Sequence, residues 1–307
     1  MCHPIPSVGI FCLALMAISP IFAQEKLGPQ LELPECDIFL FELDEAESAL
    51  SISSGKNITA RPGYDNQPWF TPNSLSLLFT ANGKPDRTDV YEYKISEGTT
   101  QALTDTPTQE YSPQISPDNT TLSFVTDGVT ANQSIWSKDR NKNQETWLLA
   151  NQTEREPVGY YVWNHETDDI LFWSRYGFSI RLVNRTEPKS HYITGHAPPS
   201  SPHIIPGRNH FSFVHRQANG ETWIKELDPN TLAIRPLVAI KGANLNYGWT
   251  PGGKIIRVEN DNLMWWSAES QRWQTITDLK QHGLTGVTRV AVSPDASKLA
   301  VVGQQNQ

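Results

Sequence analysis

Alternating apolar and polar residues recur along this chain in a repeated unit. The clearest copy, residues 111–125, reads as a short strand, a tight turn over residues 116–119 and a second strand in which Leu122 and Phe124 alternate with polar residues. A proline at the second turn position, Pro117, presets φ for such a turn, and the Asp-Asn pair after it tolerates the conformations that follow. The pattern therefore predicts a β-hairpin.

The same pattern occurs six times at a nearly constant spacing. Its turn position falls at Pro72, Pro117, His165, Pro206, Pro251 and Pro294. Successive turn positions are therefore 45, 48, 41, 45 and 43 residues apart. A period of this length, with strands and turns inside it, is typical of the blades of a propeller.

Each hairpin is followed by a third strand and a shorter fourth strand. We expect third strands at residues 89–94, 134–138, 179–183, 222–228 and 263–267. We expect fourth strands at residues 101–104, 147–150, 191–194, 235–238 and 274–277. Between the turn signals no segment sustains an apolar period of 3.6 residues, so the pattern predicts no long helix.

The sixth copy breaks off after two strands, at Val302. Residues 36–44 have the pattern of a third strand and residues 49–53 that of a fourth, and no first and second strands precede them. Joining these segments to the last copy closes the ring and removes two exposed sheet edges. We therefore predict an all-β fold, a six-bladed β-propeller of four-stranded blades, with the last blade closed by N-terminal strands.

The Ser-Pro-Asp turns, the Asp-Val-Tyr third strand and the Leu-Thr pair that closes a repeat resemble the WD-type repeats of the TolB-like β-propeller family. The resemblance covers about residues 36–302, and residues 111–125 and 292–302 carry it best. It implies a six-bladed propeller, an architecture that binding proteins and enzymes share. The Tol-system protein has an additional α/β domain before its propeller, and we expect no counterpart of that domain in this chain.

An apolar run, residues 8–22, precedes Gln24 near the start of the sequence. It is typical of a secretory signal peptide cleaved near Ala23; the alternative is an uncleaved anchor, although Pro20 interrupts the run and it is short for a membrane span. We expect a signal peptide at 1–23, an N-terminal lead-in at 24–35, a single β-propeller domain at 36–303 and a C-terminal tail at 304–307. The mature protein would be a periplasmic or secreted monomer without a membrane span.

Charge and cysteine content narrow the classes of partner and chemistry. The formal net charge is −8 and basic residues do not cluster, so we expect no nucleic-acid partner. Only Cys36 remains after the predicted cleavage, which excludes an intramolecular disulfide and favours a small core residue. Trp163 and Trp249 occupy an apolar column of the repeat and are expected in the core, whereas one of the less constrained Trp265, Trp266 and Trp273 is a candidate for exposure to a ligand.

Common catalytic signatures are missing from the sequence, and we predict no catalytic residue, no cofactor and no metal site. The adjacent Asp168 and Asp169 are expected to be solvated rather than a matched acid and base. Five histidines lie within 25 residues, but their positions on different strands argue against convergence on a metal ion. They are His191, His196, His203, His210 and His215.

Two functional classes remain open. The first is a non-catalytic propeller that binds a protein or cell-envelope partner through its funnel face. The second is a carbohydrate-active lyase or hydrolase with a site at the mouth of the channel, because propeller enzymes gather isolated side chains from several blades. Two or more carboxylates, or histidines with a carboxylate, converging at that mouth would favour the enzyme.

The repeat register also predicts where a partner would bind. Five residues before each turn position stands a polar residue, and the six form a column: Gln67, Ser112, Tyr160, Ser201, Asn246 and Arg289. Three residues later the column is apolar and should pack between blades: Phe70, Ile115, Trp163, Ile204, Trp249 and Val292. In propellers of the resembling family the innermost strand begins near the funnel mouth, so the polar column should encircle that mouth. It either contacts the partner or lines a water-filled channel, and Arg289 would favour a carboxylate or an acidic chain terminus.

Overall fold

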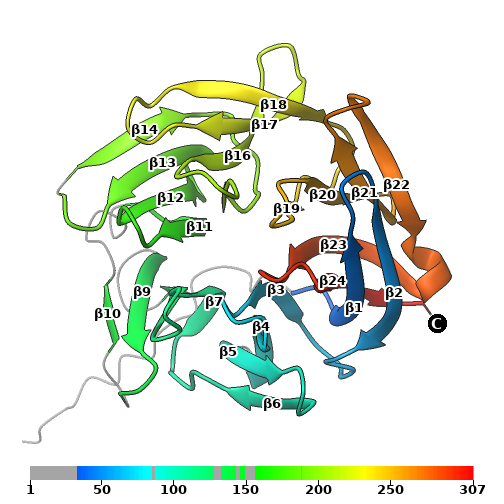
Figure 1. The fold of residues 1–307 in the computed structure, drawn as a ribbon. Coiled ribbons are helices and arrows are strands. Elements are labelled where there is room, and N and C mark those ends of the chain that lie inside the picture. Colours follow the sequence, from blue (N-terminus) through cyan, green and yellow to red (C-terminus); the bar gives the residue numbers. More distant parts are fainter. Residues whose placement is uncertain are drawn as a thin grey trace, which may run out of the picture. The chain divides into compact units, whose positions relative to one another are not determined.

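A computed structural model describes residues 33–84, 87–127, 133–142, 146–148, 156–187 and 189–306. The predicted signal peptide and most of the lead-in lie outside the described residues. From residue 33 onward the chain forms one compact unit. Six four-stranded antiparallel sheets are arranged as a ring of blades, with the innermost strands facing the centre (Figure 1). The only helix among the described residues is the 3₁₀ turn η2 (Leu279–His282). The predicted fold class and blade number are confirmed.

Five blades use four consecutive strands each, from the inside of the ring outward. Blade one consists of β3 (Asp65–Phe70), β4 (Ser76–Lys84), β5 (Arg87–Lys94) and β6 (Thr99–Ala102). Blade two consists of β7 (Gln109–Ile115), β8 (Thr121–Asp127), β9 (Ser134–Asp139) and β10 (Thr146–Leu148). Blade three consists of β11 (Val158–Asn164), β12 (Asp169–Ser174), β13 (Ser179–Asn184) and β14 (Ser190–Thr194). Blade four consists of β15 (His203–Ile204), β16 (Phe211–Arg216), β17 (Thr222–Leu227) and β18 (Ile234–Ile240). Blade five consists of β19 (Tyr247–Trp249), β20 (Ile255–Glu259), β21 (Asn262–Ser267) and β22 (Arg272–Asp278).

Blade six joins the two ends of the ring, as the sequence predicts. Its inner strands are β23 (Leu284–Val292) and β24 (Lys298–Gln305), and its outer strands are β1 (Asp37–Glu45) and β2 (Leu50–Asn57). β1 pairs with β24 along a continuous antiparallel register from Asp37 opposite Gly303 to Glu42 opposite Lys298. Pairing β24 with β1 leaves no open edge between the first and last segments of the propeller.

A hydroxyl next to the turn position stabilises four of the six predicted turns. In each, the side chain of the residue before the proline accepts a hydrogen bond from the first residues of the next strand, as Ser116 Oγ does from the Thr121 N–H (2.8 Å) and Ser293 Oγ from the Lys298 N–H (2.9 Å). Thr71 and Thr250 make the same bond in blades one and five. Such local side-chain bonds favour turns over continued strand, which is why the period is so regular.

Apolar clusters between neighbouring blades form the core. All six residues of the predicted apolar column contact these clusters: Phe70, Ile115, Trp163, Ile204, Trp249 and Val292. Trp163 and Trp249 are therefore core residues, as predicted. Of the three other tryptophans, Trp265 is buried, and Trp266 and Trp273 are half-buried and pack against each other edge to face. Trp273 Nε1 donates to the Ala239 carbonyl (3.1 Å).

Candidate functional site

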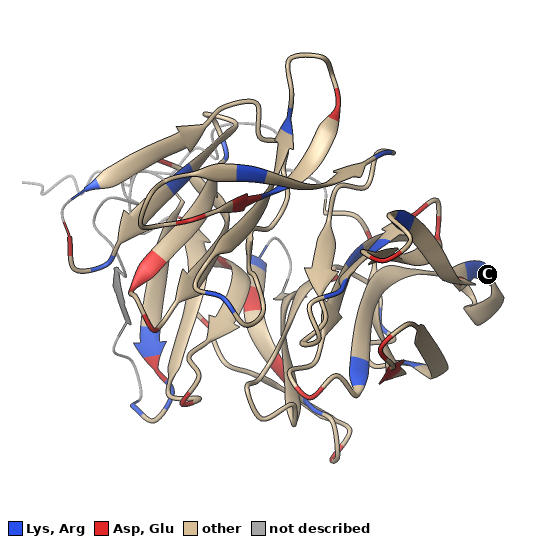
Figure 2. Ribbon diagram, turned by 45° about the horizontal axis from the view of Figure 1, so that its top comes forward, with Lys and Arg blue, Asp and Glu red and all other residues tan. Residues whose placement is uncertain are grey.

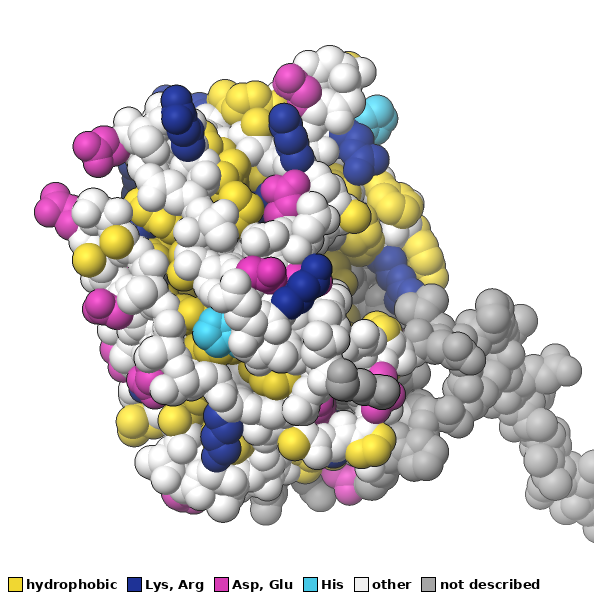
Figure 3. All heavy atoms as spheres, turned by 90° about the vertical axis from the view of Figure 1, so that its right-hand side faces the viewer, with side chains coloured by type: hydrophobic (Ala, Val, Ile, Leu, Met, Phe, Trp, Pro, Cys, Tyr) yellow, Lys and Arg dark blue, Asp and Glu magenta, His cyan; other side chains and the backbone are white. Residues whose placement is uncertain are grey.

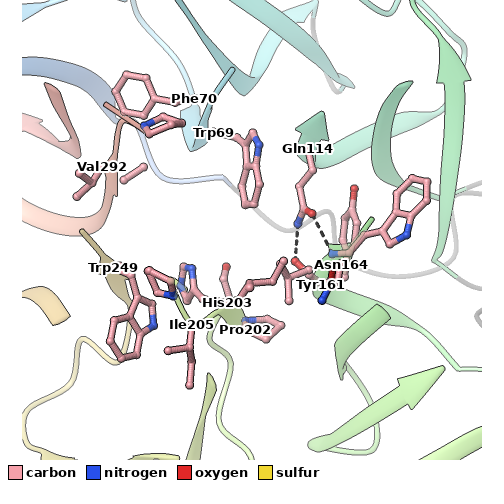
Figure 4. A pocket seen from close by; sticks show the side chains of 18 of the residues that line it. Trp69, Phe70, Gln114, Tyr161, Asn164, Pro202, His203, Ile205, Trp249 and Val292 are labelled. Atoms are coloured by element: carbon pink, nitrogen blue, oxygen red, sulfur yellow. Dashed lines mark hydrogen bonds between the residues drawn. The ribbon is translucent and has the colours of Figure 1, made fainter. Parts of the chain in front are cut away.

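The centre of the ring holds a cavity of about 920 Å³, lined by the innermost strand of every blade and by the turns that follow (Figure 4). Three levels of side chains surround it. The mouth level is the polar column, the base level contains the turn positions, and the middle level lies two residues after the polar column in each repeat. The middle level consists of Trp69, Gln114, Val162, His203, Gly248 and Ala291.

Irregularities in the innermost strands shape the mouth level. β3 and β7 each skip two residues in their pairing with the next strand, Gln67-Pro68 and Ser112-Pro113. A proline is tolerated there because its missing N–H falls outside the ladder. Gln67 and Ser112 adopt left-handed φ angles of 57° and 52°. The Gln67 side-chain oxygen accepts from the Ser112 N–H (2.7 Å), which ties blade one to blade two.

Arg289 connects four blades across the mouth. Its Nη1 donates to Ser201 Oγ (3.0 Å) in blade four and to Asn246 Oδ1 (3.3 Å) in blade five. Its guanidinium also lies over the ring of Tyr160 in blade three, 4.6 Å from the centroid. Among the residues that the structure describes, no carboxylate pairs with Arg289 and no acceptor meets its Nε or Nη2. The group is thus a fixed cation, and the N–H donors of its Nε and Nη2 remain available.

The middle level is narrowed by one large side chain. Trp69 packs against the clusters of blades one and two and also against those of blades three and four, so its indole crosses the channel. Figure 4 shows it directed from β3 toward the segment that carries Pro202 and His203. Gly248 also lines the cavity at this level.

His203 is a neutral hydrogen-bonding group inside this channel. Burial lowers its pKa to about 4, and a hydrogen bond with the Tyr247 backbone offsets this only in part. Its Nε2 is buried without a hydrogen-bond partner among the described residues. The nearby charge of Arg289 also disfavours protonation of the imidazole. At neutral pH this level therefore offers neutral hydrogen-bonding groups and apolar surface.

The base level combines prolines with one polar segment, residues 164–166. Asn164 is 3% exposed, and its Nδ2 finds no hydrogen-bond partner within the described part of the chain. The imidazole of His165 stacks on Trp163 with 3.7 Å between ring centroids, and burial lowers its pKa to about 4. Glu166 is the only carboxylate among the described residues that line the cavity.

The structure brings most of the predicted site residues together. Five of the polar column line the cavity: Gln67, Ser112, Ser201, Asn246 and Arg289. Tyr160 does not line it but stacks beneath Arg289. The sequence reading missed Trp69 and His203. Both lie two residues after the polar column in the repeat register, but the bulge at Gln67-Pro68 changes the facing of Trp69, so alternation alone does not select it.

Charged residues of both signs are interspersed along the strands and links of the ring (Figure 2). On the side of the molecule shown in Figure 3, acidic, basic and apolar side chains are likewise mixed. Among the described residues, no three His, Cys, Asp or Glu side chains are grouped so as to hold a metal ion. Those residues also include no helix that is long and apolar enough to cross a membrane.

No family model matches the sequence, and no curated protein matches it. Solved structures match in fold. TolB from Acinetobacter baumannii is 14% identical with a TM-score of 0.57, covering 88% of this chain and 65% of its own. A protein of Agrobacterium tumefaciens assigned as TolB is 13% identical with a TM-score of 0.65, covering 88% of this chain and 98% of its own. An oligogalacturonate lyase in complex with manganese is 12% identical with a TM-score of 0.54, covering 82% and 80%.

These similarities define the class of the fold. The chain is a six-bladed β-propeller with a cavity at its centre that is lined by polar and apolar side chains. Its propeller is TolB-like, as the repeat motifs indicate. The chain spans about two thirds of the length of the Acinetobacter protein, 65%. Because identity is low and both binding proteins and enzymes have this fold, the likeness identifies the architecture alone.

Proposed function

We propose that this propeller is a non-catalytic binding protein that holds a protein or cell-envelope partner at its funnel face, with a carboxylate of the partner at Arg289. The observation that carries the proposal is the state of that guanidinium. Two hydrogen bonds from Nη1 and the stacking on Tyr160 fix its position before any ligand arrives. A pre-oriented fork whose remaining N–H groups have no acceptor in the described structure suits bidentate recognition of a carboxylate.

The proposal is tested by capture of partners from an envelope extract of the source organism. The double variant Arg289→Ala, Tyr160→Ala should keep the parent melting temperature within a few degrees and lose the captured partner. Arg289→Lys keeps the charge but not the fork and should weaken capture as well. Arg272→Ala removes an exposed arginine of the outer strand β22 and serves as the matched control. Unchanged capture by the double variant would move the binding site to the outer loops.

A second candidate is a lyase or hydrolase that acts on a carbohydrate. The fold likeness to the oligogalacturonate lyase favours it, and His165 beside Glu166 would be its acid–base pair at the base level. The assay follows the ultraviolet absorbance of unsaturated product from oligogalacturonate, with and without added manganese. Turnover that disappears in Glu166→Gln but persists in Arg289→Ala would support this enzyme and reject the binding function.

We also propose that residues 1–23 are removed on export, so that the protein acts in the periplasm or outside the cell. The apolar run before Ala23 supports this. Mass spectrometry of the mature protein should find a chain that begins near Gln24. An intact Met1 on a cytoplasmic form would remove the envelope partner from consideration.

A further inference from the structure

A ladder of stacked rings leads from Arg289 at the mouth to the outer rim of blade three. The Arg289 guanidinium lies 4.6 Å from the centroid of Tyr160, and Tyr160 stacks on Trp173 at 5.7 Å with 28° between the ring planes. Trp173 meets the ring of Phe178 edge to face at 5.8 Å. Phe178 is 52% exposed, and Tyr176 in the same β12–β13 link is 76% exposed. Trp173 itself is only 4% exposed, so the ladder connects Tyr160 at the mouth to two exposed rings through a buried indole.

The inner part of the ladder is held rigidly. Trp173 Nε1 donates to the carbonyl of Ala197 (2.7 Å), and Gly159 supplies the room in which the indole lies against β11. The Phe178 carbonyl accepts from the Ala197 N–H (2.9 Å), although Phe178 has a left-handed φ of 44°. A bulky residue in that conformation is unfavourable, and such conformations concentrate at functional sites.

Blade three differs from blades four and five at this position. The equivalent link of blade four contains Gln217, Asn219 and Gly220, and that of blade five contains Asn260 and Asp261. Polar residues and glycine are the ordinary composition of such links. Two exposed rings in the link of blade three, connected to Tyr160 through the buried Trp173, indicate contact with another molecule.

We propose that the half-buried Tyr160 and the exposed Phe178 and Tyr176, held in place by the buried Trp173, bind the last residues of a peptide whose free C-terminal carboxylate lies at Arg289. The inference rests on the proposed function and specifies the partner. The three steps of the ladder place Phe178 at most about 16 Å from Arg289, which four to five residues of extended chain span at about 3.3 Å each. An apolar side chain four or five residues before the C-terminus would thus rest on Phe178 and Tyr176.

The distribution of charge favours a peptide over an acidic polysaccharide. A polyuronide carries a carboxylate on every sugar and needs cations along its whole length. The ladder has its cation at the inner end only. Arg175, at the base of the outer link, donates to Gln133 (3.1 Å). Burial raises the pKa of the Asp127 carboxyl, and the nearby charge of Arg175 partly opposes that rise. A ligand with one carboxylate at one end and an apolar group at the other matches this arrangement.

The experiment pans a library of random hexapeptides with free C-termini against the full chain. Selected peptides are then measured by fluorescence anisotropy as free acids and as C-terminal amides. We expect selected peptides to share an aromatic or branched aliphatic residue four or five positions from the end and to bind as acids only. The double variant Tyr176→Ser, Phe178→Asn should lose roughly tenfold in affinity and the upstream preference, yet keep the preference for the acid. Asn tolerates the left-handed backbone at position 178.

Controls separate this inference from the proposed function. Tyr192→Ser removes an exposed ring of blade three that lies off the ladder, on β14, and should bind like the parent. Selection for the free acid without any upstream preference, or an unchanged affinity of the double variant, would overturn the ladder but leave the carboxylate site. Equal binding of acids and amides, or full binding by Arg289→Ala, would reject the carboxylate site itself. Displacement of the peptide by trigalacturonate with loss of trigalacturonate binding in the double variant would assign the surface to a glycan.

Discussion

Trp173 lies against the backbone at Gly159 so closely that a β-carbon there would stand 2.3 Å from Cε3 of the indole. The glycine is therefore required by the stacking of Trp173 on Tyr160 rather than by its own φ angle. A distance this short forces one of the two groups to move.

Gly159→Ala should consequently destabilise the protein by about 1–3 kcal/mol, the usual cost of overpacking a tight core, because Trp173 must leave its site. The measurement is the free energy of unfolding in urea. Gly248→Ala is the matched control, because the nearest atom to a β-carbon at Gly248 lies at 3.5 Å, and it should change stability by less than about 0.5 kcal/mol. Equal stability of the two variants would show that the indole has another place to go.

The local sequence pattern was sufficient to predict the ring of six blades, but not the side-chain contacts across its centre. A hydroxyl such as that of Ser116 or Ser293 stabilises its turn through a bond to a residue a few positions away. The period, the number of blades and the closure of the ring could therefore be predicted from the sequence. Contacts such as Arg289 over Tyr160 join opposite blades, and no local pattern encodes them. The direction of Trp69 depends on the bulge at Gln67-Pro68, which changes the facing of the residues after it.

The exposure of the aromatic residues in the β12–β13 link of blade three could not be predicted from the sequence either. Phe178 stays at the surface because Trp173 already occupies the space beneath it, and no local pattern encodes that contact. For Trp273 the sequence suggested fewer contacts than the structure shows. It looked unconstrained in the sequence, yet the buried guanidinium of Arg257 lies 5.5 Å from its ring.

Because β1 and β2 close the ring, we expect the stability of the folded protein to depend strongly on these N-terminal strands. Ile38 and Phe41 of β1 are almost fully buried against β24 and its neighbours, so a chain that lacks residues 33–57 would expose both an apolar face and a free strand edge. We expect the truncated protein to aggregate, as measured by size-exclusion chromatography and light scattering. Adding residues 33–57 as a separate peptide should restore a soluble complex. Cooperative melting of the truncated chain alone at the parent temperature would contradict closure of this kind.

Glu110 predicts that stability falls as the pH rises toward neutrality. Burial raises its pKa to about 7 from 4.5, although the hydroxyls of Thr104, Thr106 and Thr108 donate to the carboxylate and oppose the shift. The folded state therefore keeps a proton that the unfolded state has lost between pH 4.5 and 7. The contribution of Glu110 to stability is full below that window and is lost as the pH rises through it.

Replacing the carboxyl by an amide should remove this dependence. Glu110→Gln is expected to flatten the stability profile between pH 4.5 and 7 and to raise stability at pH 8 by up to about 3 kcal/mol. Part of the slope should remain, because burial also raises the pKa of Asp65, to about 6. Urea unfolding at a series of pH values measures both effects. A variant with the parent slope would mean that Glu110 is ionised in the folded protein.

Gln114 joins blades two and three through its amide, and this gives the sharpest test of the channel wall. Its Nε2 donates to the Tyr161 carbonyl (2.6 Å), and its Oε1 accepts from the Trp163 N–H (3.3 Å), the two dashed bonds of Figure 4. The side chain thereby acts like one step of a β-ladder between two blades, inside the wall of the cavity. Gln114→Ala leaves a buried carbonyl and a buried N–H unpaired and should cost about 2–4 kcal/mol at every pH.

Gln114→Glu should instead be sensitive to pH. A protonated carboxyl can donate to the Tyr161 carbonyl and accept from the Trp163 N–H, whereas a carboxylate would repel that carbonyl. Burial and the carbonyl would both raise the pKa of the new group in the folded state, so its stabilising contribution is present at low pH and is lost as the pH rises above 4.5 toward the folded pKa. Unfolding measured against the parent at pH 4.5 and pH 8 should show near-parental stability of the Glu variant at the lower pH and a loss at least as large as that of Gln114→Ala at the higher one. A Glu variant that tracks the Ala variant at both pH values would show that the carboxyl does not restore the two bonds, and an Ala variant as stable as the parent would show that the amide bridge contributes nothing to the contact between the blades.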